Sequence, residues 1–220
     1  TDYKAYRLQE KKDVPPPNSA KLAYSLGYVF GKNNAAAIVN LDTDRFMAAF
    51  RDGYFGLPSL LSENEIKKVL TDYKNEREEQ AKAELEQQGI DNKRKGNAYL
   101  AENARKAGVQ TTTSGLQYEV INNGSGARPK ASDTVEVHYE GKFIDGTVLD
   151  SSIARGQTSS FRLDQVIPGW TEGVQLMREG AKYRLTLPAN LAYGALGADS
   201  VPPNAVLVFE VQLIKVSKSK

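Results

Sequence analysis

Cysteine is absent from this chain of 220 residues, and histidine occurs once. Without Cys there can be no disulfide, thiolate nucleophile or Cys-ligated metal, and a single His leaves no His cluster for zinc or haem. The sequence also lacks any run that approaches the roughly 18 apolar residues of a membrane span. These absences exclude a disulfide scaffold, most metal sites and a transmembrane helix.

Charge of either sign is nearly balanced, with 29 Lys+Arg against 27 Asp+Glu and a formal net charge of +2. We find no concentrated basic patch, so we do not expect nucleic acid as a partner. The composition, 40% hydrophobic and 25% charged, is that of a soluble globular protein. At roughly 100 to 200 residues per domain, the length allows one large domain or two modest ones.

The two halves of the chain differ in composition and in the pattern of their apolar residues. Residues 1–109 hold 7 of the 18 glycines and long charged, Ala-rich stretches, whereas residues 110–220 hold the other 11 and short alternating apolar runs. This pattern predicts a helical half followed by a mostly β half.

The helical half opens with a polar segment, residues 1–17, which ends in three prolines and indicates a flexible, extended arm. A first helix is predicted from Asn18 or Ser19, either of which can cap it. Its apolar residues recur at helical spacing, beside a stripe of small residues four apart. The apolar residues are Leu22, Leu26, Val29 and Phe30, and the stripe is Ala23, Gly27 and Gly31.

A second helix is predicted after Leu41, with Asp42 or Asp44 as its cap. Ser62 and Glu65 then form a capping box that opens a charged run lasting to about Lys106. As one helix of about 45 residues this run would span about 65–70 Å. Its apolar positions thin out after residue 73, which indicates a solvated stalk.

Two short helices rich in Phe and Tyr, with the start of a long one, make a poor core by themselves. We therefore predict a homodimer through residues 18–75, with a monomeric helical bundle as the alternative. The predicted parts are an arm (1–17), a helical dimerisation module (18–62), a stalk helix (63–109) and a C-terminal domain (110–220).

The C-terminal half reads as strands with one short helix, an α+β arrangement. In residues 134–143, Val135, Val137 and Tyr139 alternate with polar residues, and residues 205–216 alternate likewise around Phe209. A short helix is predicted near 166–177, with Pro168 in its first turn. The sole His, His138, falls on the polar face, where we expect it exposed or hydrogen-bonded rather than catalytic, so we set nucleophilic hydrolysis aside.

Several ordered motifs in residues 110–220 resemble the FKBP-type peptidyl-prolyl isomerase domain from end to end. They are VHYEGKF, VLDSS, VIPGW, LAYG and PPNAVLVF. The N-terminal half, with YSLG and KGNAYLAENARKAGVQ, resembles the macrophage infectivity potentiator group of Gram-negative bacteria. The resemblance implies an FKBP-type antiparallel sheet wrapped around a short helix.

The activity that the resemblance implies is cis-trans isomerisation of X-Pro bonds in unfolded or partly folded polypeptides. This reaction has a barrier of about 18–20 kcal/mol and breaks no bond, so it needs no nucleophile, metal or cofactor. The runner-up hypothesis is a holdase chaperone that binds unfolded chains in the cleft of a V-shaped dimer. A weaker alternative is a non-catalytic adaptor for a proline-containing partner.

The resemblance also implies the site residues. Trp170 would form the pocket floor, and Tyr193 would donate its hydroxyl to a substrate carbonyl. Asp150 would be the polar wall group, paired with Tyr139 and Arg155. The apolar walls would be Tyr139, Phe161, Val166, Ile167 and Phe209, with Leu149 and Val201 as secondary contacts.

Some positions depart from the family pattern. Leu149 stands where a Phe is common, Ser159 replaces another rim aromatic, and Ala198 occupies a loop position often held by His or Tyr. The loop from residue 193 to 202 is about one residue shorter. These departures bear on the residue preferred before proline and on affinity for macrolide inhibitors such as tacrolimus and rapamycin.

The chain begins at Thr1 rather than Met, so we expect that a preceding segment has been removed. From the resemblance we expect a periplasmic protein, with outer-membrane association in some relatives. A cytoplasmic location is the alternative.

Overall fold

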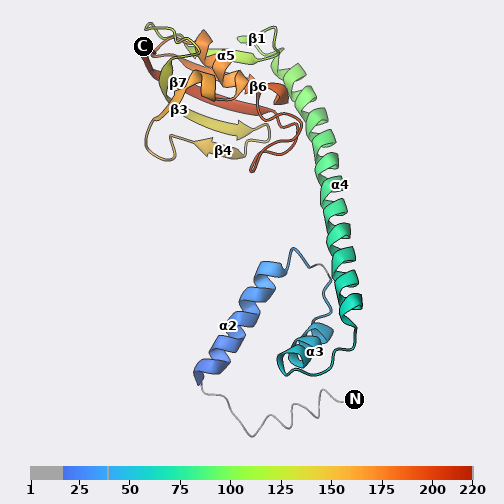
Figure 1. Ribbon diagram of the computed structural model, residues 1–220. Coiled ribbons are helices and arrows are strands. Elements are labelled where there is room, and N and C mark those ends of the chain that lie inside the picture. The colour runs from blue at the N-terminus through green and yellow to red at the C-terminus, as the bar shows by residue number, and fades with distance from the viewer. Residues whose placement is uncertain (1–16, 39, 220) are drawn as a thin grey trace. The chain divides into compact units, whose positions relative to one another are not determined.

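The computed structural model describes residues 17–38 and 40–219 (Figure 1). These residues divide after Leu70 into two compact units, each of which is described by itself. The arm predicted for residues 1–17 lies outside the described residues except for Pro17, which begins the first described helix.

The first unit contains α2 (Pro17–Asn34), α3 (Thr43–Tyr54) and the start of α4 (Glu63–Asn103). The side chain of Asp42 caps α3 by accepting a hydrogen bond of 3.0 Å from the Arg45 N–H. The capping box of α4 is also present, because the Ser62 N–H donates to Glu65 at 2.8 Å and the Glu65 N–H donates to the Ser62 hydroxyl at 3.3 Å. Both caps confirm the sequence prediction.

The helices of the first unit bury little of their apolar surface. The rings of Phe30 in α2 and Phe46 in α3 stack with centroids 5.5 Å apart. Even so, α3 has no buried residue, and Leu26 and Tyr54 are 63% and 75% exposed. Most large apolar side chains of α2 and α3 therefore face solvent in a single chain.

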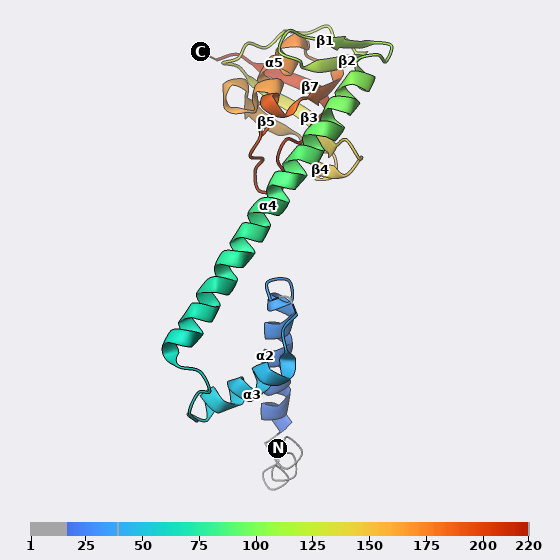
Figure 2. The ribbon, with the colours of Figure 1, turned by 90° about the vertical axis from the view of Figure 1, so that its right-hand side faces the viewer.

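Helix α4 is one continuous element of 41 residues, which at 1.5 Å per residue is about 60 Å long. It ends at Asn103, a few residues earlier than predicted. Residues 78–88 are all exposed, but Gly89, Gly96 and Asn103 are buried. Figure 2 shows the C-terminal part of α4 running alongside the sheet, where Gly96 lies against Val206.

The second unit is built on one antiparallel sheet of seven strands, in the order β1-β2-β6-β7-β3-β4, with β5 also paired to β3. Strand β3 lies between β7 on one side and β4 and β5 on the other, and it pairs along its length with β7, placing Gly141 opposite Phe209. The strands are β1 (Val109–Thr111), β2 (Gln117–Asn122), β3 (Thr134–Phe143), β4 (Val148–Ser151), β5 (Ser159–Arg162), β6 (Lys182–Leu187) and β7 (Leu207–Ser217).

Helix α5 (Pro168–Leu176) lies across the sheet (Figure 1). A short 3-10 turn, η2 (Leu163–Gln165), precedes α5, and a second one, η3 (Ala189–Leu191), follows β6. Trp170 and Val174 of α5 are buried against the sheet residues of the core, together with Val137, Leu185 and Val211. The predicted α+β class, the strand over 134–143 and the short helix after Pro168 are confirmed. Within the described residues, no helix is both long and apolar enough to cross a membrane.

Candidate active site

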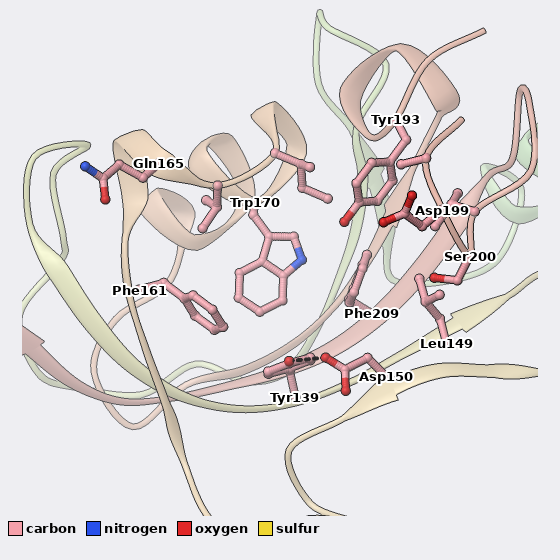
Figure 3. A pocket seen from close by; sticks show the side chains of 14 residues that line it. Tyr139, Leu149, Asp150, Phe161, Gln165, Trp170, Tyr193, Asp199, Ser200 and Phe209 are labelled. Atoms are coloured by element: carbon pink, nitrogen blue, oxygen red, sulfur yellow. Dashed lines mark hydrogen bonds between the residues drawn. The ribbon is translucent and has the colours of Figure 1, made fainter. Parts of the chain in front are cut away.

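A cavity of about 620 Å³ opens between α5, the sheet and the loop that precedes β7. Figure 3 shows the Trp170 indole at the centre of the lining side chains, with Phe161 and Phe209 on either side and Tyr139 below. The residues that line this cavity are Tyr139, Leu149, Asp150, Phe161, Gln165, Val166, Ile167, Trp170, Tyr193, Ala198, Asp199, Ser200, Val201 and Phe209.

The floor is a cluster of four aromatic rings centred on Trp170. The indole meets Tyr139, Phe161 and Phe209 edge to face, with centroids 5.2, 5.6 and 5.4 Å away. Edge-to-face pairs place the positive ring edge against the negative face of a neighbour, and each contributes about 0.5–1.5 kcal/mol beyond its buried area. The cluster is therefore a fixed apolar surface.

Local sequence explains how these rings come together. Tyr139 and Phe209 occupy inward positions of β3 and β7, and Gly141 leaves room for the Phe209 ring, which a Cβ at that position would overlap. Pro168 starts α5 because its fixed φ suits the first helical position. The residue before it, Ile167, is accordingly extended, and its carbonyl accepts a hydrogen bond of 2.9 Å from the Trp170 N–H.

A polar cluster forms one wall of the cavity. The Tyr139 hydroxyl donates to the Asp150 carboxylate, as the dashed line in Figure 3 marks. Arg155 forms an ion pair with the same carboxylate and donates to the Tyr139 hydroxyl oxygen at 2.9 Å. The three side chains thus hold one another, in the pairing that the resemblance implies.

Electrostatics keep Asp150 ionised. Partial burial by itself would raise the pKa of Asp150, but hydrogen bonds from Tyr139 and Arg155 and the charge of Arg155 outweigh it and hold the pKa below the usual value. Burial, followed by the hydrogen bond to Asp150, raises the pKa of Tyr139. At neutral pH the wall therefore presents a carboxylate, a neutral phenol and a guanidinium.

His138 lies behind this wall rather than in the cavity. Its Nδ1 is 3.2 Å from the hydroxyl of Ser152, which is fully buried and accepts a hydrogen bond of 2.8 Å from the Tyr139 N–H. His138 is therefore hydrogen-bonded, as predicted. The Ser152 hydroxyl bonds to the backbone of β3 and does not line the cavity.

The opposite side of the cavity comes from the segment between η3 and β7, residues 192–206, which we call the rim loop. Tyr193 is 40% exposed, and Figure 3 shows its hydroxyl directed toward the cavity, near Asp199. Val201 is buried and pairs by backbone hydrogen bonds with Ala198. The rim loop therefore offers both polar and apolar groups to a bound molecule.

The structure brings together the residues that the resemblance implied. The floor, the polar group, the hydroxyl donor and the apolar walls all line the cavity, and so do Leu149, Ala198 and Val201. The first set is Tyr139, Asp150, Phe161, Val166, Ile167, Trp170, Tyr193 and Phe209. Arg155 reaches the cavity wall through Asp150, whereas Ser159 is not among the lining residues. Sequence reasoning missed Gln165, Asp199 and Ser200. The only signals were that Gln165 directly precedes VIPGW and that Asp199 and Ser200 lie shortly before Pro202 and Pro203.

No group of three or more His, Cys, Asp or Glu side chains suited to a metal ion occurs in residues 17–38 and 40–219.

Two family models match the chain. Residues 126–214 match the model of FKBP-type peptidyl-prolyl cis-trans isomerases, and residues 19–120 match the domain amino-terminal to that isomerase.

Curated relatives cover most of the chain. The FKBP-type peptidyl-prolyl cis-trans isomerase FkpA of Aeromonas hydrophila is 46% identical over 202 residues, which are 89% of this chain and 75% of that protein. The outer membrane protein MIP of Legionella longbeachae is 40% identical over 200 residues, 90% of this chain and 86% of that protein. This chain belongs to the FKBP-type peptidyl-prolyl cis-trans isomerase family.

A solved structure agrees with this assignment. The crystal structure of FkpA from Escherichia coli matches with a TM-score of 0.77 and 39% identity, covering 93% of this chain and 99% of that one. The chain is thus a peptidyl-prolyl cis-trans isomerase with a helical N-terminal region and an FKBP domain. The comparisons favour this activity over the holdase that was the alternative.

Proposed function

We propose that this isomerase acts on X-Pro bonds of unfolded or partly folded polypeptides, with the proline ring seated on the Trp170 indole. The observation that carries the proposal is the aromatic cluster around Trp170 with an ionised carboxylate at its edge. A flat apolar floor accepts a five-membered ring, and the open side lets the peptide chain enter and leave.

Rotation of the amide needs a site that binds the twisted form more tightly than the planar one. Loss of resonance leaves the carbonyl less polar, so removal from water favours the transition state. A ten-thousandfold acceleration needs a preference of only about 5.5 kcal/mol. The apolar walls, Phe161, Val166, Ile167 and Phe209, supply this setting in our proposal.

The polar residues orient the substrate. We assign the Tyr193 hydroxyl as the donor to a substrate carbonyl, since it is directed into the cavity (Figure 3). Asp150 faces the rotating amide, and Arg155 and Tyr139 keep its charge in place. Leu149 and Val201 contact the residues next to proline. Macrolides such as tacrolimus and rapamycin would compete for the same floor.

The test is a proline-limited refolding assay with Trp170→Leu and Asp150→Ala. Each should reduce kcat/KM at least tenfold, because Trp170→Leu removes the floor under the proline ring and Asp150→Ala removes the carboxylate that faces the rotating amide. Asp145→Ala is the control for charge removal, since Asp145 lies in the turn before β4 and outside the cavity. If both variants catalyse refolding as the unaltered protein does, the site assignment is wrong.

We further propose the homodimer through residues 18–75. The support is the first unit itself, in which Leu22, Tyr24, Tyr28 and Phe50 are all more than half exposed. A group of large apolar side chains that face solvent together marks an interface more often than a free monomer surface. Light scattering of the full chain should give twice the chain mass, and a monomer would support the helical bundle instead.

We propose the division into an arm (1–17), dimerisation module (18–62), stalk (63–109) and isomerase domain (110–220), where the helical part of the stalk is α4 and ends at Asn103. We also propose a periplasmic location with outer-membrane association, in keeping with the name of the Legionella longbeachae relative. Fractionation of cells that express the natural gene tests this location, and recovery with the cytosol would favour the alternative.

A further inference from the structure

A second groove adjoins the proline cavity, and the two share one wall. The groove has a volume of about 480 Å³ and lies between α4 and the rim loop. The four residues from Ala198 to Val201 line the groove on one side and the proline cavity on the other. A chain that leaves the cavity over this segment of the rim loop enters the groove directly.

The groove presents apolar side chains to solvent. Leu196 at its edge is 91% exposed, and Leu85 of α4 is 54% exposed. Pro202 and Pro203 add further apolar surface, and Gln88 of α4 contributes an amide. This mixture suits a peptide segment, whose apolar side chain can cover the leucines while its backbone pairs with an amide.

The two walls of the groove are fixed to each other. The Asn92 side chain donates a hydrogen bond of 2.9 Å to the Pro203 carbonyl, and the Asn204 side chain donates one of 3.1 Å to the Gly89 carbonyl. A Cβ built at Gly89 would lie 3.2 Å from the Pro203 Cβ, so the glycine allows helix and loop to approach closely. The groove therefore exists before any ligand binds.

We propose that this groove is a secondary substrate site, which binds an apolar side chain of the polypeptide segment next to the isomerising proline. The proposal rests on the proposed function, because the same polypeptide must occupy the Trp170 cavity. Continuity between cavity and groove identifies the occupant, since a flanking segment is the chain that the shared wall delivers. Affinity for long substrates should therefore exceed affinity for peptides too short to reach the groove.

The experiment compares two peptides: a four-residue proline peptide and a twelve-residue peptide with leucines on both sides of the proline. The variant carries Leu85→Ser and Leu196→Ser, two exposed positions whose change should leave the fold intact. Its KM for the long peptide should rise roughly fivefold, which corresponds to about 1 kcal/mol, a fraction of the free energy of burying two leucine side chains. The kcat for the long peptide and the KM for the short one should change less than twofold.

The matched control is Ile90→Ser, because Ile90 is also on α4 and is 56% exposed but does not line the groove. It should behave as the unaltered protein does with both peptides. Gln88→Ala provides a second variant, and it should weaken only the long peptide.

Three results would overturn the groove proposal. An unchanged KM for the long peptide would show that the leucines do not contact it. An equal loss with both peptides, found in Gln88→Ala as well, would show that these residues do not act on the flanking segment. A change in oligomeric state by light scattering, absent in Ile90→Ser, would assign the groove to a second copy of the chain. By contrast, an unaltered protein that isomerises neither peptide would refute the proposed function itself.

Discussion

The Trp170 indole meets the Tyr139 ring edge to face, with centroids 5.2 Å apart and planes at 87°. Trp170 is only 4% exposed and is the sole tryptophan of the chain. It therefore belongs at once to the core of the FKBP domain and to the floor of its cavity, and its emission reports on that place alone.

Binding at the cavity should change the intrinsic fluorescence of the protein. A proline peptide or a macrolide that packs on the small exposed part of the indole changes the polarity and packing around it, so we expect a saturable change in Trp170 emission. A fluorescence titration measures this change, with a peptide that carries Ala in place of Pro as its control. Binding seen by calorimetry without any change in emission would place the ligand elsewhere.

Truncation of the floor should also cost stability. Trp170→Ala removes three edge-to-face contacts from a close-packed core, and we expect the free energy of unfolding to fall by about 3–5 kcal/mol. Urea unfolding followed by circular dichroism measures this loss. Tyr24→Ala, at a solvent-facing aromatic of α2, should change the unfolding of the FKBP domain by less than about 0.5 kcal/mol.

The lowered pKa of Asp150 predicts the pH dependence of catalysis. A carboxylate whose pKa is depressed on folding contributes stability above its unfolded pKa and loses it as pH falls through the folded value. The ordinary pKa of Asp is about 3.9, so the Asp150 carboxylate stays charged above that pH. If this charge is needed for catalysis, activity should be level from about pH 5 to 8 and decline only below about pH 4.

Asp150→Asn keeps an acceptor for Tyr139 but removes the charge, so its activity should be lower throughout and lack that acid decline. Peptide isomerisation between pH 3.5 and 8 tests this, with a thermal melt at each pH to separate unfolding from loss of the charge. A step between pH 6 and 7 that vanishes in Asp150→Asn would mean that its pKa is raised.

The contact between α4 and the rim loop predicts an unusual response to Gly96→Ala. Alanine in a helix is ordinarily favoured over glycine by about 0.5–1 kcal/mol, but here the new Cβ would lie 2.7 Å from a Val206 methyl group. We therefore expect destabilisation of the FKBP domain, measured by urea unfolding with Trp170 emission. Val206→Ala in the same chain should relieve part of the loss, so the two changes should couple.

The same substitution at Gly53 of α3 is the control, because a Cβ there has no atom of the described residues within 4 Å. Gly53→Ala should leave the FKBP domain unchanged. Additive effects of Gly96→Ala and Val206→Ala would show that the helix does not rest on Val206.

Sequence patterns predicted the regular parts of the fold because those parts are long enough to show a period. The alternation of Val135, Val137 and Tyr139 placed β3 with the correct face inward, and Asp42 and Ser62 marked the helix starts. Strands β1, β4 and β5 span only three or four residues, too few for a period to appear, and they form by pairing with the longer strands β2 and β3.

The site was predictable where family motifs carry it, as at Tyr193 of the rim loop, and not at loop residues outside those motifs. Asp199 and Ser200 reach the cavity because the rim loop folds back on itself, with Ala198 paired to Val201. The attachment of α4 to that loop depends on glycines and on amide-to-carbonyl bonds from Asn92 and Asn204, which leave no periodic signal. Such contacts become visible only in three dimensions.

The stripe of small residues on α2 gives the sharpest test of the dimer. A Cβ built at Gly27 or Gly31 would have no atom of the described residues within 4 Å, so a larger residue there fits a single chain without strain. If a second copy packs closely on this stripe, Gly27→Leu should weaken the dimer at least tenfold while helix content stays the same. Sedimentation over a range of concentrations measures the dissociation constant.

The control is Lys32→Leu, which adds the same side chain elsewhere on α2 and should leave the dissociation constant within about threefold of the original. Helices that approach closely across small residues tolerate no such addition, whereas a face that meets only water accepts it. An unchanged dimer in Gly27→Leu would move the interface away from the stripe, toward the exposed aromatics of α3, where Phe50→Ser should then weaken it.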